Sequence, residues 1–149
     1  MKCTGDNAWV TGNAQVTDNA QVTDNAWVTD NAWVTDNAWV TGNAWVTGNA
    51  RVTGDARVTG DAVISHDGLV RGGTCHLVVG PAPSSGRYTT AHVDTKIGVR
   101  INCGCFSGSI VEFEQAIENT HENGTVAFAW YRGVLALIKV FSANLLKED

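Results

Sequence analysis

Tryptophans recur at six-residue spacing in the first third of this 149-residue chain, and arginines take the same position in later copies. An indole ring stacks on planar ligands and on cations, and it covers a large apolar area when a partner buries it. These side chains are therefore candidates for a ligand platform or a protein interface. They are Trp9, Trp27, Trp33, Trp39, Trp45, Arg51 and Arg57.

Histidines and cysteines offer two further kinds of chemistry. His66 and His76 follow the tryptophan-rich region, where an imidazole could act as a general base. Cys103 and Cys105 form a C-x-C pair, but the second pair at zinc spacing is missing, so we expect buried reduced thiols. The sequence therefore assigns no catalytic residue, no metal site and no cofactor.

A short polar loop has the composition of an anion-binding nest with one guanidinium group. It comprises Ser84, Ser85 and Arg87, with a glycine between the last two. His121 is the fourth candidate for this anion site. The hypothesis requires the assembled protein to bring Arg87 beside His121 or beside the tryptophan rings.

The six-residue period of the sequence predicts the secondary structure that positions these tryptophans and arginines. From Trp9 to Ala62 the pattern x-Val-Thr-[Asp/Gly]-[Asn/Asp]-Ala runs through nine unbroken copies. An α-helix turns about 600° in six residues, so the valines would scatter over several faces. In a strand such as Ala26–Thr29, alternation places alanine and valine on one side and tryptophan and threonine on the other. The Asp-Asn or Gly-Asn pair then supplies a bend, because these residues tolerate left-handed backbone angles.

An aliphatic residue followed four places later by a small one, as in Val28 and Ala32, resembles the left-handed β-helix of hexapeptide-repeat proteins. The resemblance covers about half of the chain and implies triangular coils of three repeats, about three to four coils in all. Residues eighteen positions apart then stack. The outward columns become Trp9/Trp27/Trp45, Gln15/Trp33/Arg51 and Gln21/Trp39/Arg57. A spiral of antiparallel hairpins is the alternative, although two-residue hairpin turns prefer Asn-Gly or Asp-Gly.

The column Trp9/Trp27/Trp45 would expose an apolar patch of the size that marks an interface. Proteins of this family commonly form trimers with their prisms side by side, so the resemblance implies a homotrimer. A ligand platform for planar bases or sugars is the alternative. Arginines one rung from Trp33 and Trp39 are placed for cation–π contacts, or simply end an apolar stripe.

Hexapeptide-repeat acyltransferases provide a third possibility, because they use a histidine in a groove between subunits as general base. His66 or His76 would take that role here. The repeat is short, however, and no insertion interrupts it to enclose a thioester donor.

Three regions are predicted along the chain: a repeat unit over residues 1–78, a connector over 79–90 that holds both prolines, and an α+β cap over 91–149. Leu69–Thr74 is expected to form one degraded rung that ends the repeats. Alternation predicts two strands, Arg87–Asp94 and Ile97–Asn102.

Two helices are predicted in the cap. Ser109 and Glu112 form a capping box at the start of the first, which His121–Gly124 ends. The second runs from about Val126 to Leu146 and is apolar nearly all round, so it needs cover on several sides. This is a second argument for oligomerisation.

The formal net charge of -5 argues against nucleic acid or an anionic membrane as the main partner. No signal peptide is visible and four cysteines are too few for a disulfide framework, so a cytoplasmic location is expected. Cys103–Gly108, together with Glu112-Phe113 and Thr120-His121, resembles the C-terminal part of small uncharacterised phage and bacterial proteins.

We therefore expect a non-enzymatic homotrimeric binding or assembly module, of the kind a phage or prophage encodes, in the cytoplasm of the host cell. The alternative is a protein that sequesters a small nucleotide-like signal of host defence.

Overall fold

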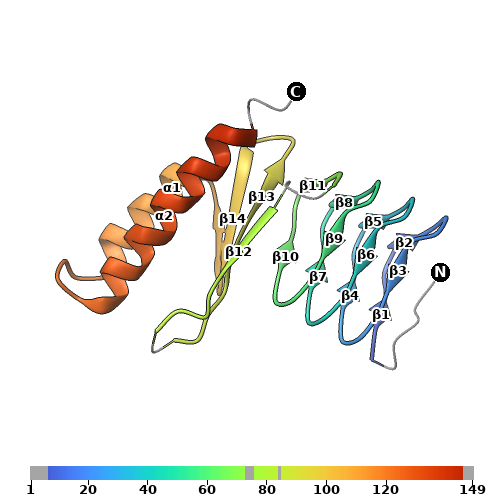
Figure 1. Ribbon diagram of the computed structural model, residues 1–149, viewed down its shortest axis with the longest axis horizontal. Coiled ribbons are helices and arrows are strands. Elements are labelled where there is room, and N and C mark those ends of the chain that lie inside the picture. Colours follow the sequence, from blue (N-terminus) through green and yellow to red (C-terminus); the bar gives the residue numbers. More distant parts are fainter. Residues whose placement is uncertain (1–6, 73–75, 84, 146–149) are drawn as a thin grey trace.

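Eleven two-residue strands wind into a parallel β-solenoid of about three turns (Figure 1). The computed structural model describes residues 7–72, 76–83 and 85–145. The strands are β1 (Trp9–Val10), β2 (Gln15–Val16), β3 (Gln21–Val22), β4 (Trp27–Val28), β5 (Trp33–Val34), β6 (Trp39–Val40), β7 (Trp45–Val46), β8 (Arg51–Val52), β9 (Arg57–Val58), β10 (Val63–Ile64) and β11 (Leu69–Val70).

The strands stack at the predicted interval of eighteen residues. They form three parallel sheets, ordered β1-β4-β7-β10, β11-β8-β5-β2 and β3-β6-β9. Trp9 pairs with Trp27 and Trp27 with Trp45, and the Trp27 amide donates to the Ala44 carbonyl at 2.9 Å. This parallel register excludes the spiral of antiparallel hairpins.

The interior of the solenoid holds the valines and alanines, as alternation predicts. Val28, Val34 and Val40 are fully buried, as are the alanines that precede the strands β3 to β10. Bends use the left-handed backbone that Asp and Gly permit, for example at Asp30 with φ 60° and at Gly54 with φ 64°. A ladder of asparagine side chains joins successive turns, so the repeat is held on its outside as well as in its core.

An antiparallel four-stranded sheet follows the solenoid. Its strands are β12 (His76–Val79), β13 (Thr89–Asp94), β14 (Gly98–Cys103) and β15 (Phe106–Gly108), in that order. The predicted repeat unit ended at residue 78, yet His76–Val79 pairs antiparallel with β13 and belongs to this sheet. Its alternate residues face two cores, Val78 the solenoid and Leu77 and Val79 the helices, which is why no hexapeptide pattern marks it.

Two helices, α1 (Ile110–Thr120) and α2 (Val126–Leu145), cover the other face of this sheet (Figure 1). Ser109 caps α1 in a capping box with Glu112, and His121 is the C-cap, as predicted. We call β12–β15, α1 and α2 the C-terminal unit. Its core includes Ile101, Phe113 and Ile138.

The helix α2 buries Val134, Leu135 and Ile138 but leaves Leu137 and Val140 exposed. By length and composition alone, Val126–Asn144 is long and apolar enough to cross a membrane, with 22% of that stretch buried in the fold. A single helix of this kind is weak evidence for a membrane span, since core helices of soluble proteins have the same composition.

Candidate functional site

Three tryptophans of the first column form one stack on the outside of the solenoid. The ring centroids of Trp9 and Trp27 are 5.5 Å apart, and those of Trp27 and Trp45 are 5.2 Å apart with planes only 3° from parallel. The rings remain 55%, 36% and 46% exposed in that order. Val63 continues the column on the last rung, so this face is apolar from end to end. We call these four residues the indole column.

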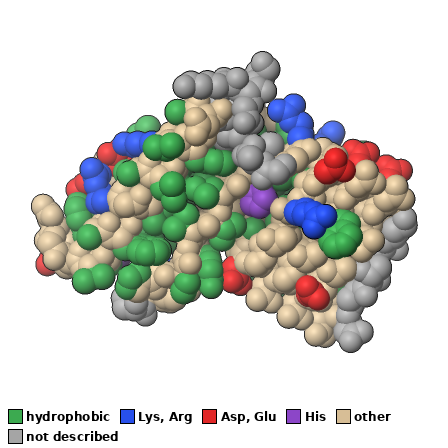
Figure 2. Space-filling view, viewed as in Figure 1, with side chains coloured by type: hydrophobic (Ala, Val, Ile, Leu, Met, Phe, Trp, Pro, Cys, Tyr) green, Lys and Arg blue, Asp and Glu red, His purple; other side chains and the backbone are tan. Residues whose placement is uncertain are grey.

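The other two columns each hold a single tryptophan between a glutamine and an arginine. Arg51 lies over the Trp33 ring at 5.2 Å, and Arg57 lies over Trp39 at 5.0 Å, as the spacing predicts. Figure 2 shows one hydrophobic patch beside a basic side chain on the visible face of the solenoid, whereas hydrophobic side chains gather over the C-terminal half. The three faces therefore differ, and only the indole column is continuously apolar.

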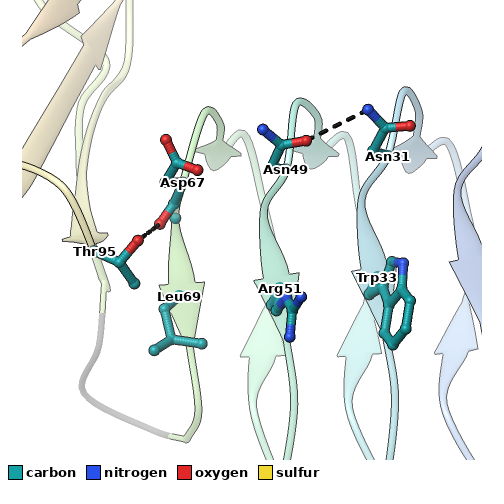
Figure 3. A pocket seen from close by; sticks show the side chains of 8 residues that line it. Asn31, Trp33, Asn49, Arg51, Asp67, Leu69 and Thr95 are labelled. Carbon is teal, nitrogen blue, oxygen red and sulfur yellow. Dashed lines mark hydrogen bonds between the residues drawn. The ribbon is translucent and has the colours of Figure 1, made fainter.

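A groove of about 550 Å3 lies on the second column where the solenoid meets the C-terminal unit. In Figure 3, Trp33, Arg51 and Leu69 lie in one row along the strands, and Asn31, Asn49 and Asp67 lie in a second row at the bends. Thr95 closes the groove from the C-terminal unit, where its hydroxyl donates to the Asp67 carbonyl. The groove thus combines an aromatic ring, a cation, a carboxylate and amides, which suits a polar planar ligand.

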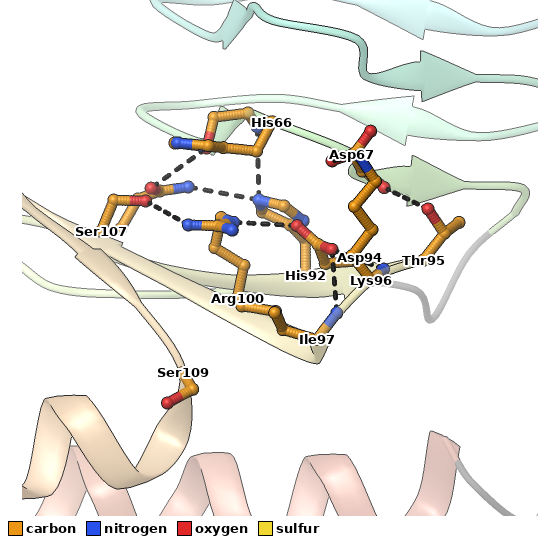
Figure 4. A network of polar contacts seen from close by, with 12 residues as sticks. His66, Asp67, His92, Asp94, Thr95, Lys96, Ile97, Arg100, Ser107 and Ser109 are labelled. Atoms are coloured by element: carbon orange, nitrogen blue, oxygen red, sulfur yellow. Dashed lines mark hydrogen bonds and ion pairs between the residues drawn. The ribbon is translucent and has the colours of Figure 1, made fainter.

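A buried polar network seals the end of the solenoid beneath this groove (Figure 4). Side chains of the sheet take the place of a further rung. Thr90 accepts from the Val63 amide at 3.0 Å, and Asn102 donates to the Val63 carbonyl at 3.0 Å. His92 accepts from the Ser65 amide at 3.3 Å. The sheet therefore satisfies backbone groups that the last rung leaves open.

His92 is fully buried in this network, between groups that require a neutral ring. Its Nδ1 donates to the Val93 carbonyl at 2.8 Å, which leaves Nε2 to accept from Ser65 and Asn102. Burial lowers the pKa of His92 from 6.5 to about 4, although the Val93 carbonyl and Asp94 favour the charged form. The arrangement is structural, because every polar ring atom is occupied.

The two histidines proposed as general bases occupy different settings. His66 lies exposed at a bend with φ 55°, and its Nδ1 bonds the Ser65 hydroxyl at 2.9 Å. His76 is half-buried in β12 opposite His92, and burial lowers its pKa. Neither lies in the groove described above.

A smaller pocket in the C-terminal unit brings together two members of the predicted anion site. Arg87 and His121 both line it, with Tyr131 between them, and the His121 ring stacks on Tyr131 at 5.2 Å. This happens within one chain rather than across a trimer. Ser85 bonds Tyr131, and Ser84 lies outside the described residues.

Cys103 is buried in this pocket and Cys105 is exposed on the adjoining turn, both as free thiols, while Cys75 lies outside the described residues. Within the described part of the chain, no three His, Cys, Asp or Glu side chains cluster as metal ligands would. Sequence reasoning missed Tyr131 and His92, since neither belongs to a local motif.

Comparison of the chain with protein-family models, with curated proteins and with solved structures finds no match. The fold is assigned from the strand order and the helices alone, as a parallel β-solenoid with two C-terminal helices.

Proposed function

We propose that the protein is a non-enzymatic binding and assembly module that forms a homotrimer of left-handed solenoids through the indole column. The observation that carries this proposal is the continuous stack of Trp9, Trp27 and Trp45, whose rings are 36–55% exposed along one face. Contiguous apolar surface of this kind on a soluble domain marks a contact site.

The second copy is the best-matched occupant of this face. Taking about 200–250 Å2 for a whole tryptophan side chain, the exposed fractions leave about 300 Å2 of indole per copy. A standard interface buries about 800 Å2 per partner, so the threonines and bends beside the indoles must also contact the neighbour. A flat prism face supplies such a surface without any change of shape, and a trimer closes when the indole columns of three copies meet around one three-fold axis.

Light scattering of the purified protein tests this proposal. We expect a mass near three times the chain mass of 15.8 kDa. Trp27→Gln should shift the protein toward monomer, whereas Trp39→Gln should not, because Trp39 is equally exposed but lies in another column. A monomeric wild-type protein, or equal effects of the two substitutions, would refute the indole column as the contact.

The groove on the second column supports a second candidate function, the sequestration of a small nucleotide-like ligand. Trp33 offers a partly exposed aromatic ring, and Arg51, which lies over that ring, offers a cation for a phosphate. Asp67 and Asn49 line the same groove and can accept or donate hydrogen bonds to ribose hydroxyls. Lys96 pairs with Asp67 at 3.4 Å and adds positive charge at the rim.

A thermal-shift panel of cyclic dinucleotides and mononucleotides tests this second function. A binding nucleotide should raise the melting temperature of the wild type and lose its effect in Arg51→Gln. Arg57→Gln is the matched control, because Arg57 makes the same contact with Trp39 but lies outside the groove. The absence of any shift across the panel, or an equal loss in both variants, would count against this site.

A further inference from the structure

The pocket in the C-terminal unit has no part in self-association or in the groove, and its lining points to a ligand of its own. It has a volume of about 110 Å3. That is about the liquid volume of four water molecules, so it suits a small ligand or the end group of a larger one. The described lining residues are Arg87, Cys103, Phe106, Phe113, Ala116, Ile117, Thr120, His121 and Tyr131.

Arg87 is held at this pocket by the connector loop and by a glycine. The Ala82 amide donates to the Arg87 carbonyl at 2.8 Å, and the Gly86 amide donates to the Ala82 carbonyl at 2.9 Å. The guanidinium packs over Gly104, where an added Cβ would lie 3.2 Å from its Nε and Cζ atoms. The guanidinium therefore lies over Gly104 at the edge of the pocket, with its side chain exposed.

Hydroxyl and ring groups surround this cation. Tyr131 accepts a weak bond from the Cys103 thiol at 3.9 Å and shares a hydrogen bond with Ser85. Burial raises the pKa of Tyr131, so the phenol keeps its proton and remains a donor. The His121 ring stacks on it with an angle of 16° between the planes.

Much of the pocket lining is apolar, and the charge in the lining is positive. The ring centroids of Phe106 and Phe113 lie 5.4 Å apart in the lining, which also includes the buried Ile117. Arg87 carries the positive charge, and none of the described lining residues is acidic. One guanidinium beside apolar lining residues matches a planar anion with a short hydrocarbon tail better than a trianionic phosphate.

We propose that this pocket binds a short-chain carboxylate, with the carboxylate paired to Arg87 and the Tyr131 hydroxyl and the tail against Phe106, Phe113 and Ile117. The proposal does not depend on the trimer or on the nucleotide groove. A ligand of about six non-hydrogen atoms gives a dissociation constant in the millimolar range, so the assay must cover that range.

NMR titration of the full-length protein with butyrate tests the proposal, with butanamide, acetate and inorganic phosphate as comparison ligands. Butyrate should shift the Arg87 Nε–H signal and the backbone amides of the lining. Butanamide, which lacks the charge, and acetate, which lacks the tail, should bind at least about tenfold more weakly. Arg87→Gln should weaken butyrate by a similar factor, while Arg71→Gln, an exposed arginine outside the pocket, should not.

Three results would overturn the proposal: equal binding of butyrate and butanamide, unchanged butyrate binding in Arg87→Gln, or no pocket shifts at tens of millimolar butyrate. Tighter binding of inorganic phosphate would instead identify a phosphate site and overturn the carboxylate assignment. Circular dichroism and the melting temperature verify that Arg87→Gln is folded, which is expected because the side chain is exposed.

Discussion

Acid is expected to destabilise the junction between the solenoid and the C-terminal unit through His92. The pKa of this residue falls from 6.5 in the unfolded chain to about 4 in the fold, with burial as the main cause. Between these values the unfolded state binds a proton that the folded state excludes. The stabilising contribution is therefore complete above pH 6.5 and is lost as the pH falls toward 4.

The magnitude follows from the size of the shift. Each unit of pKa is worth about 1.4 kcal/mol, so the free energy of unfolding should fall by up to about 3 kcal/mol across this range. Protonation would also place an Nε2–H against the Ser65 amide and the Asn102 amide, which both donate to that atom. The hydrogen-bond geometry and the burial of His92 therefore both predict that acid lowers the free energy of unfolding.

Neighbouring groups define the control. Burial also lowers the pKa of His76, which lies opposite His92. His76 therefore makes the free energy of unfolding fall with pH in the same direction as His92 does. Burial raises the pKa of Asp94, but hydrogen bonds from Arg100 and two backbone amides lower it overall. The stability that Asp94 contributes is therefore lost only as the pH drops below 3.8, outside the range in which His92 acts. The contribution of His92 is thus the difference between wild type and His92→Gln, which keeps an amide donor and acceptor but does not titrate.

Urea unfolding at fixed protein concentration, from about pH 7 to about pH 4.5, provides the measurement. The wild type should lose up to about 1.4 kcal/mol more per pH unit than His92→Gln. Identical slopes for wild type and His92→Gln would refute the buried neutral histidine as the acid-sensitive element.

Two matched pairs of substitutions and one single substitution test the packing. Val40→Ala empties a fully buried position and should cost about 2–3 kcal/mol by chemical denaturation, whereas Val111→Ala, 76% exposed, should cost less than about 0.5 kcal/mol. Gly54→Ala should lower the free energy of unfolding by more than about 1 kcal/mol, because φ is 64° and the new Cβ would lie 2.5 Å from a carbonyl oxygen. Gly133→Ala, in the open middle of α2, should instead raise the free energy of unfolding by up to about 1 kcal/mol. Ser109→Ala removes the capping box and should cost about 1 kcal/mol, with reduced helicity of α1 by hydrogen exchange. Equal effects within either matched pair, or an unchanged α1, would contradict the packing described above.

The solenoid was predictable because its information is local and repeated. Each Val-Thr-Asp-Asn-Ala unit specifies its own strand, bend and inward side chains, and the stacking interval follows once three units make a turn. The contacts of Arg51 and Arg57 with their tryptophans follow from the same interval. The capping box of α1 was also local, since Ser109 and Glu112 are three residues apart.

The junction and the pocket were not predictable in the same way, because they join residues from distant segments. Ser65, His92 and Asn102 meet across 37 residues of sequence, and no motif relates them. One signal was present: Thr90, His92 and Asp94 are polar at every second position, although this face of β13 is buried. A polar stripe on a buried strand indicates a network that caps another element.

Photo-crosslinking tests the central proposal, that the indole column is a contact between copies, most directly. A benzoylphenylalanine replaces Thr29 beside Trp27 in one variant and Thr41 beside Trp39 in the other, two outward positions with the same burial. Irradiation at Thr29 should produce covalent dimers and trimers of the chain, while irradiation at Thr41 should leave mainly monomers. Equal crosslinking at both positions, or crosslinking at Thr41 alone, would contradict the proposal.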